Sequence, residues 1–262
     1  MVIMKIRAML FLIICYTLVI GTYLHGRTRT KLSIVAASDL YNVLGDIKTT
    51  VEARHPDLVL QFSFGASGSL AAQIQQGAPF DIFLSADEDL PTRLYKAGFS
   101  NDNGPFLFTI GSLVLWVRND LGIDVRRDEL KALFSPAVSR ISIANPKVAP
   151  YGKAAESALR GAGIYDQVKA KLVFADNIAQ AAHFLYAGAA EAGVISPSQA
   201  NNATLRRDGL VWKIPKHLYP PIKQAGIILK SSSNIHQAKI FRDFLLSREG
   251  QAIFVKHGFG RI

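Results

Sequence analysis

Two serines follow apolar strands in this chain, and a helix pattern begins after each of them. Ser38 comes after Leu32-Ser-Ile-Val-Ala-Ala, and Ser67 comes shortly after Leu58-Val-Leu-Gln-Phe-Ser-Phe. A strand that ends in Ser and Gly before a helix presents unpaired backbone N–H groups beside hydroxyl donors, which suits an anion. The alternative is that both serines only cap their helices. Two such turns at neighbouring strand ends favour a ligand, because open α/β sheets bind at the carboxyl ends of their strands.

The rest of the chain offers no recognisable catalytic or metal-binding arrangement. Its six histidines show no His-x-x-x-His spacing, and its single cysteine cannot form a metal cluster. The segment from Gly65 to Ser69 resembles the nucleophile elbow Gly-x-Ser-x-Gly only superficially, because its last residue is Ser. What remains is a set of neutral donors without Lys or Arg among them. Helix N-termini and hydroxyls of this kind can hold a fully deprotonated tetrahedral oxyanion.

The elements that must position these donors alternate between short strands and helices. Such alternation predicts an α/β fold with mostly parallel sheets covered by helices on both faces. The theme recurs in the second half of the chain without a true sequence repeat. The expected strands are 31–37, 58–64, 80–85, 107–117, 141–144, 172–174, 192–195, 210–214 and 223–229, and the expected helices are 39–55, 69–76, 89–97, 128–134, 153–160, 179–187, 234–246 and 248–257.

Length and composition describe a globular protein. The 262 residues suffice for one large or two small domains, and a hydrophobic content of 49% argues against disorder. The net charge is +10, but no run of five or more Lys or Arg occurs, so nucleic acid is not an expected partner. The only cysteine, Cys15, lies in the N-terminal leader, so the folded part has no disulfide.

Residues 1–30 have the character of a targeting segment. Lys5 and Arg7 precede the apolar run Ala8–Leu24, as in a secretory signal peptide. No clear Ala-x-Ala marks a cleavage point, so an uncleaved membrane anchor stays open as an alternative. Cys15 lies in the middle of the run rather than at its end, which disfavours lipoprotein processing.

The segment Gly77–Asp87 reads Gly-Ala-Pro-Phe-Asp-Ile-Phe-Leu-Ser-Ala-Asp. This segment and several others resemble the ModA family, the periplasmic molybdate-binding proteins of ABC importers. The resemblance runs from about residue 31 to the C-terminus, and its most specific part is Gly77-Ala-Pro-Phe-Asp-Ile-Phe-Leu-Ser-Ala-Asp87. It implies a two-lobed type II periplasmic binding protein with two crossover strands. The first lobe would comprise residues 31–112 and 223–262, and the second lobe residues 113–222. The other segments that carry the resemblance are Ala36-Ala-Ser38, Ser67–Gln76, Asn145-Pro146, Pro150–Leu159 and Gly250–Phe259.

The resemblance also implies an oxyanion site in the cleft between the lobes. Ser38 and Ser67 would donate hydroxyl and backbone hydrogen bonds from the first lobe. Tyr151 matches a position that donates through its backbone N–H, and in some members through its hydroxyl, and Ile178 matches a second backbone donor. Ser196 stands where some members carry a ligand-binding tyrosine, so it is a further candidate for binding the oxyanion.

Asp39 is the one carboxylate expected beside this site. A carboxylate would repel an oxyanion, so we expect the Asp39 side chain to point away and cap its helix. Its backbone N–H remains a candidate donor to the ligand.

By resemblance, the chain is an extracytoplasmic solute-binding protein that captures molybdate or tungstate for an ABC permease. It would be a monomer without catalysis or cofactor, would bind molybdenum or tungsten only as the oxyanion, and would close around hinges near 112–114 and 220–224. Two alternatives stay open: an oxyanion-sensing module anchored by residues 8–24, and the same fold selective for another oxyanion such as sulfate. A hydrolase using Ser67 is disfavoured, because no base is visible.

Overall fold

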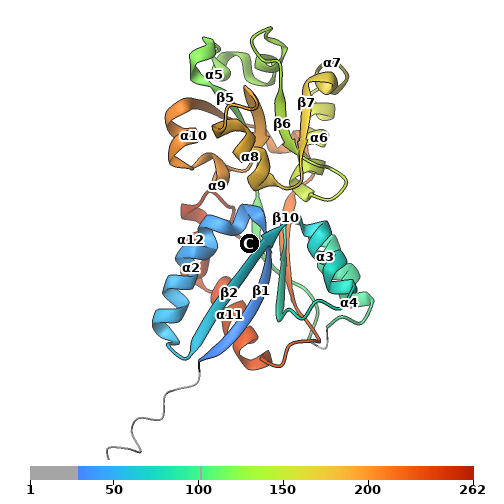
Figure 1. Ribbon diagram of the computed structural model, residues 1–262, viewed down its shortest axis with the longest axis vertical. Helices are drawn as coiled ribbons and strands as arrows, with labels where there is room; N and C mark the ends of the chain where they lie inside the picture. The colour runs from blue at the N-terminus through green and yellow to red at the C-terminus, as the bar shows by residue number, and fades with distance from the viewer. Residues whose placement is uncertain (1–28, 101) are drawn as a thin grey trace, which may run out of the picture.

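The computed structural model describes residues 29–100 and 102–262. The expected signal peptide or anchor at 1–30 therefore lies outside the described residues, apart from its last two positions. In the part of the chain that is described, no helix combines the length and the apolar character needed to cross a membrane. Figure 1 shows two lobes stacked along the longest axis, each with its own sheet.

The first lobe is built on a five-stranded sheet of order β2-β1-β3-β10-β4. β1 pairs parallel with β2 and β3, whereas β10 runs antiparallel to β3 and β4. The strands are β1 (Thr30–Ala37), β2 (Leu58–Gly65), β3 (Ile82–Ser85), β4 (Phe106–Gly111) and β10 (Ile222–Ile228), and the helices are α2 (Tyr41–Arg54), α3 (Ser67–Gln75), α4 (Asp89–Lys96), α11 (Ile235–Leu246) and α12 (Arg248–Lys256).

Helices cover both faces of this sheet, as β1 illustrates. Leu32 and Ile34 point into the core that includes Phe241 of α11, whereas Val35 points to the opposite face with Leu70 of α3. Alternate residues of a strand face opposite sides of its sheet, so a strand that is apolar on both sides must be covered twice.

The second lobe repeats the plan with a sheet of order β7-β6-β8-β5-β9. β6 pairs parallel with β7 and β8, and β5 runs antiparallel to β8 and β9. Its strands are β5 (Val114–Arg118), β6 (Ile141–Ala144), β7 (Leu172–Ala175), β8 (Ala192–Ile195) and β9 (Gly209–Lys213), and its helices are α5 (Val125–Asp128), α6 (Pro150–Gly161), α7 (Tyr165–Val168), α8 (Ile178–Tyr186), α9 (Pro197–Ala200) and α10 (Ala203–Asp208).

Two crossover segments join the lobes. β4 leads into β5 through Ser112 and Leu113, and the chain returns from β9 to β10. The crossovers are tied together, because the Leu113 N–H donates to the Tyr219 hydroxyl at 3.1 Å and the Leu113 carbonyl accepts from the Ile214 N–H at 3.1 Å.

The α/β, two-lobed fold class predicted from the sequence is confirmed. Each sheet is mixed, because one of its strands runs antiparallel to the others. The expectation of one strand over 107–117 is wrong, since Ser112 and Leu113 separate two strands that join different sheets. The expected helix at 128–134 is also wrong in kind, because Glu129–Phe134 is a 3-10 helix that follows α5. The short helices α7, α9 and α10 were not expected.

Candidate functional site

A small cavity lies between the two lobes. It gathers the predicted site residues Ser38, Asp39, Ser67, Tyr151 and Ile178, but not Ser196. These residues come from four separate turns that each follow a strand, so the fold brings strand ends of both sheets to one place. The cavity is lined by Ala37, Ser38, Asp39, Gly65, Ala66, Ser67, Ala86, Ala149, Pro150, Tyr151, Asn177 and Ile178.

Ser38 starts a 3-10 turn (Ser38–Leu40) directly after β1. Its buried hydroxyl donates to Asn177 Oδ1 at 3.1 Å, and its oxygen lies 3.4 Å from the Ala179 backbone nitrogen. Both contacts cross from the first lobe to the second. The hydroxyl makes no capping bond, so the interpretation of Ser38 as only an N-cap does not hold. Rotation about its Cβ–Oγ bond can direct the same hydrogen to an anion.

Ser67 is the first residue of α3 and is almost fully buried. Its Oγ accepts a hydrogen bond from the Ala86 N–H at 3.0 Å. Because the oxygen is the acceptor in that bond, the hydroxyl hydrogen stays available for a ligand in the cavity. The preceding residue, Ala66, is the N-cap and makes no side-chain capping bond.

The second lobe contributes the N-termini of α6 and α8. Pro150 opens α6 and Tyr151 follows it, while Ile178 opens α8 after its cap Asn177. Asn177 Oδ1 accepts from the Ala179 and Gln180 N–H groups, both at 3.0 Å. Backbone N–H groups of a first helical turn have no acceptor within their own helix. With α3, three helices therefore direct the positive ends of their dipoles at one cavity.

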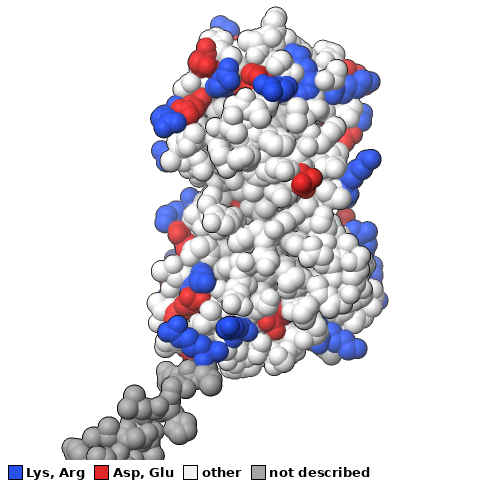
Figure 2. Space-filling view, viewed as in Figure 1, with Lys and Arg blue, Asp and Glu red and all other residues white. Residues whose placement is uncertain are grey.

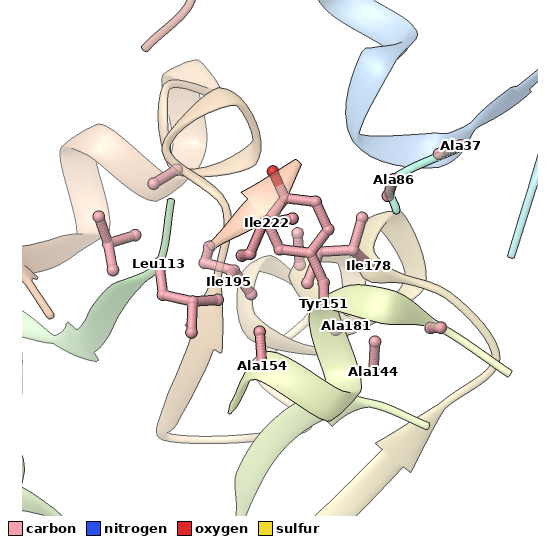
Figure 3. Packing of buried hydrophobic residues seen from close by; sticks show 14 of the residues in the cluster. Ala37, Ala86, Leu113, Ala144, Tyr151, Ala154, Ile178, Ala181, Ile195 and Ile222 are labelled. Carbon is pink, nitrogen blue, oxygen red and sulfur yellow. The ribbon is translucent and has the colours of Figure 1, made fainter. Parts of the chain in front are cut away.

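The Tyr151 ring is turned into the apolar core rather than toward solvent. Figure 3 shows it in one cluster with Ile178, Ile222 and Leu113. Its hydroxyl accepts from Gln224 Nε2 at 3.1 Å. Burial, followed by the nearby Asp39 carboxylate, raises the pKa of Tyr151 well above its ordinary value. The Tyr151 hydroxyl therefore belongs to a buried cluster with Asp39 and Gln224.

Asp39 does not cap a helix, which corrects the expectation for its side chain. No side-chain capping bond occurs at the 3-10 turn or at α2. The side chain turns inward and is fully buried, and its Oδ2 accepts from Gln224 Nε2 at 2.6 Å. Burial outweighs the hydrogen bonds from Gln224 and Tyr151 and raises the pKa of Asp39 to about 6. The prediction was wrong because the hydrogen-bond partner of Asp39 is Gln224, which lies on β10, a strand much later in the chain.

Ser196 lies away from the cavity as the N-cap of α9, where its Oγ accepts from the Gln199 N–H at 3.2 Å. The short helix then reaches the first lobe through Ser198 and Gln199. Ser198 Oγ donates to the Asp39 carbonyl at 2.9 Å, and Gln199 Nε2 donates to the Ser38 carbonyl at 3.0 Å. Ser196 thus acts on the Ser38 turn indirectly.

Two residues of the site were missed from the sequence. Asn177 Oδ1 accepts a hydrogen bond from the Ser38 hydroxyl, and the position of Asn177 just before an expected helix is a typical N-cap signal. Gln224 is a fully buried polar residue within the apolar strand β10. An uncharged polar residue in an apolar strand is a signal that a buried partner exists, although it does not identify the partner.

The cavity contains no Lys or Arg among its lining residues. On the face shown in Figure 2, charged side chains gather toward the two ends of the molecule, and the waist between the lobes carries few of them. Among residues 29–100 and 102–262, no group of three or more His, Cys, Asp or Glu side chains could hold a metal ion. An anion here would be held by neutral donors and helix dipoles.

Comparison with known proteins gives a consistent result. The family model of the bacterial extracellular solute-binding proteins matches residues 32–260. The molybdate-binding protein ModA of Rhodobacter capsulatus is 36% identical over 198 residues, which cover 76% of each chain. ModA of Azotobacter vinelandii is 34% identical over 230 residues, covering 88% of this chain and 90% of the relative. The solved Azotobacter vinelandii periplasmic molybdate-binding protein superposes with a TM-score of 0.80 at 31% identity, covering 87% of this chain and 98% of that one.

Proposed function

The chain belongs to the bacterial extracellular solute-binding proteins, as a member of the molybdate-binding ModA type, and we propose that it captures molybdate or tungstate in the cavity between its lobes for import. It is a binding protein and not an enzyme. The ligand is bound as an intact oxyanion, and no protein atom coordinates the metal.

The observation that carries the proposal is the convergence of neutral donors. Two serine hydroxyls and the first turns of α3, α6 and α8 meet at one cavity whose lining residues include no Lys or Arg. Each hydrogen bond to an ion is stronger than a neutral one, and each helix N-terminus adds partial positive charge. A doubly charged tetrahedral anion gains from all of these donors at once.

The roles of the individual residues follow from this arrangement. Ser38 and Ser67 donate through hydroxyl and backbone groups, and Tyr151 and Ile178 donate through backbone N–H groups. The Asp39 backbone N–H is a further donor. Ser196 supports the site through α9, where it caps the helix that reaches the Ser38 turn.

Ligand capture is coupled to movement of the lobes. Residues 31–112 with 223–262 act as one lobe and residues 113–222 as the other, and they rotate about hinges near 112–114 and 220–224. The break between β4 and β5 at Ser112 and Leu113 supports the first hinge, and the start of β10 at Ile222 supports the second.

The partner of the loaded protein is an ABC transporter permease, and the protein acts outside the cytoplasm. The N-terminal segment 1–30 serves as its signal peptide or as a membrane anchor, and the protein acts as a monomer that does not bind nucleic acid. Fractionation separates transport from the alternative of an anchored sensor. A mature chain that begins near residue 25–31 excludes the anchored sensor.

The test of the ligand is calorimetry with molybdate, tungstate, sulfate and phosphate. We expect molybdate or tungstate to bind with a dissociation constant below roughly 10 μM, which corresponds to about −7 kcal/mol. Weaker binding of both removes the proposed ligand. Preference for sulfate would keep the fold and site but change the transported ion.

A further inference from the structure

Asp39, Gln224 and Tyr151 form a buried polar cluster that spans the two lobes. Asp39 follows β1 and Gln224 lies on β10, both in the first lobe, whereas Tyr151 belongs to α6 of the second lobe. The exposed fraction is 0% for Asp39 and Gln224 and 1% for Tyr151. The cluster is complete only while the lobes are together, because one of its three members belongs to the second lobe.

This cluster is short of hydrogen-bond donors. Gln224 Nε2 donates to Asp39 Oδ2 at 2.6 Å and to the Tyr151 hydroxyl oxygen at 3.1 Å, which uses both of its hydrogens. The Tyr151 O–H is the one remaining donor of the three side chains, and it is directed at the Asp39 carboxylate. Two acceptors, Asp39 Oδ1 and Gln224 Oε1, are buried and have no hydrogen-bond partner among the residues that the structure describes. A buried unsatisfied acceptor is costly, and more so when it carries charge. Protonation of the Asp39 carboxylate would add a hydrogen-bond donor to the cluster and would also remove its negative charge.

No cation compensates the carboxylate from the elements packed around it. The residues 38–40 contact α2, α8 and α9, and the side chain contacts β10 and α6. The titratable group that reaches Asp39 is Tyr151, with Tyr219 acting on Tyr151 in turn. The other titratable groups on these elements are paired elsewhere or lie at the surface. On β10 and α8, Lys223 Nζ contacts Glu88 at 3.1 Å and His183 contacts Tyr186 at 2.6 Å. On α2 and α6 the pairs are Asp46 with Lys256 and His257, Lys48 with Glu52, Arg54 with Glu249, and Glu156 with Arg160, while Tyr41 is exposed and Lys153 lies at the surface beside Asp87. Helix α9 (Pro197–Ala200) carries no titratable side chain.

We propose that Asp39 takes up a proton when the lobes close, so that oxyanion capture by this chain is coupled to proton uptake. The inference rests on the proposed function, since it concerns the same closed site. In the open protein, Tyr151 withdraws with the second lobe and water reaches the carboxylate, which is then ionised at neutral pH. In the closed protein, the neutral acid removes a buried negative charge beside the bound anion.

The direction of the pH dependence follows from the closed state having the higher affinity for the proton. Burial raises the pKa of Asp39 from 3.8 to about 6 in the closed protein. Affinity for the oxyanion is therefore greatest at low pH, falls as the pH rises through about 6, and is constant above that window. A shift of that size corresponds to about a hundredfold in affinity over the whole window from pH 6 down to 3.8, of which about tenfold falls above pH 5. The negative charge of a bound oxyanion extends the window to higher pH.

The experiment is calorimetry of the whole mature protein with molybdate between pH 5 and 8.5, in buffers that differ in ionisation enthalpy. We expect the wild type to lose affinity with rising pH and to take up a proton on binding, as reported by the buffer dependence of the heat. Asp39→Asn supplies the amide hydrogens without a titration, so it should show neither effect beyond the titration of the ligand itself. Asp120→Asn, which neutralises an exposed carboxylate beside Arg118, should behave as the wild type.

Several results would overturn the inference. One is a wild type whose affinity changes with pH no more than that of Asp39→Asn, and another is the absence of proton uptake in the wild type, which needs no variant. Preference for phosphate over molybdate and tungstate would mean that Asp39 stays ionised and accepts the ligand's own proton. If none of the four oxyanions binds at any pH, the proposed function fails and this inference fails with it, whereas pH-independent molybdate binding leaves the proposed function standing.

Discussion

The backbone N–H of Gly68 donates a hydrogen bond to the carbonyl oxygen of Val148 at 2.9 Å, and this bond joins the first lobe to the second. Gly68 directly follows the site residue Ser67 in α3, and Val148 lies just before α6. A Cβ atom on residue 68 would lie 2.8 Å from the Val148 carbonyl oxygen and 3.3 Å from its Cα. Both are backbone atoms, so only glycine allows this approach of the two lobes.

Gly68→Ala should therefore weaken oxyanion binding. The two loops must separate to accommodate the methyl group, and we expect the loss of affinity to be about tenfold or more, or at least about 1.4 kcal/mol. The ligand-free protein should be unchanged or slightly more stable, because Ala is favoured over Gly in a helix by about 1 kcal/mol. Calorimetry and thermal denaturation measure the two effects separately.

Gly45→Ala is the matched control for this substitution. Gly45 also lies in a helix of the first lobe, but a Cβ there meets no atom within 4 Å. It should leave affinity unchanged. Equal affinities for the two variants would show that the contact between Gly68 and Val148 is absent from the ligand-bound state.

Ser67→Ala tests the hydroxyl that faces the cavity. Loss of a hydrogen bond to a charged partner costs about 1.5–3 kcal/mol, so affinity should fall by roughly ten- to more than a hundredfold. Stability should also fall by about 1 kcal/mol, because the buried Ala86 N–H loses its acceptor. Calorimetry of the variant with molybdate, compared with its thermal unfolding, distinguishes the two losses.

A control for the loss of stability is Ser142→Ala in the second lobe. The Ser142 hydroxyl is also fully buried and donates to the Ala181 carbonyl at 2.9 Å, away from the residues that line the cavity. It should lower stability by a comparable amount and keep its affinity. A Ser67→Ala variant that binds as tightly as Ser142→Ala would remove Ser67 from the donors.

The positions of the site serines were predictable because their signals are local. Ser38 and Ser67 follow strands whose apolar runs are clear in the sequence, and the strands at 141–144 and 192–195 were predicted with the bounds that the structure shows. Turn residues at the carboxyl ends of neighbouring parallel strands gather at one edge of their sheet. The sequence therefore reported which residues could meet.

The conformation of Asp39 was not predictable, because it depends on distant residues. Its hydrogen-bond partner Gln224 is 185 positions further along the chain, and no local pattern records that pairing. The break at Ser112 and Leu113 was missed for a related reason. Only Gly111 and Ser112 interrupt the apolar run there, and the strand divides because its halves join different sheets.

Ser196→Ala should affect stability more than ligand contact. The substitution removes the N-cap of α9, which typically costs about 1 kcal/mol. Affinity should fall less than in Ser67→Ala, because Ser196 acts on the Ser38 carbonyl only through Gln199. Unfolding temperature and dissociation constant should be measured for both variants. A Ser196→Ala protein with unchanged stability and the affinity loss of Ser67→Ala would place the Ser196 hydroxyl in contact with the ligand.

Glu191 should stabilise the second lobe in a pH-dependent way. Its carboxylate accepts hydrogen bonds from the Ser139 hydroxyl at 2.8 Å, the Arg140 N–H at 2.8 Å and Arg140 Nη2 at 3.0 Å. Burial alone would raise the pKa of Glu191, but the hydrogen bonds from Arg140 and Ser139 together outweigh it and lower the pKa to about 2. The stabilisation is therefore fully present above pH 4.5 and is lost as the pH falls toward 2.

Glu191→Gln should consequently lower the free energy of unfolding at pH 7 by about 2–3 kcal/mol, and the difference from wild type should shrink as the pH falls below 4.5. Urea unfolding between pH 3 and 7 measures it. Glu156→Gln breaks an exposed pair with Arg160 one helical turn away and should cost only about 0.3–0.5 kcal/mol. A Glu191→Gln deficit that stays constant down to pH 3 would mean that the cost comes from the shape of the amide, because a charge-dependent contribution must decline as the wild-type carboxylate is protonated.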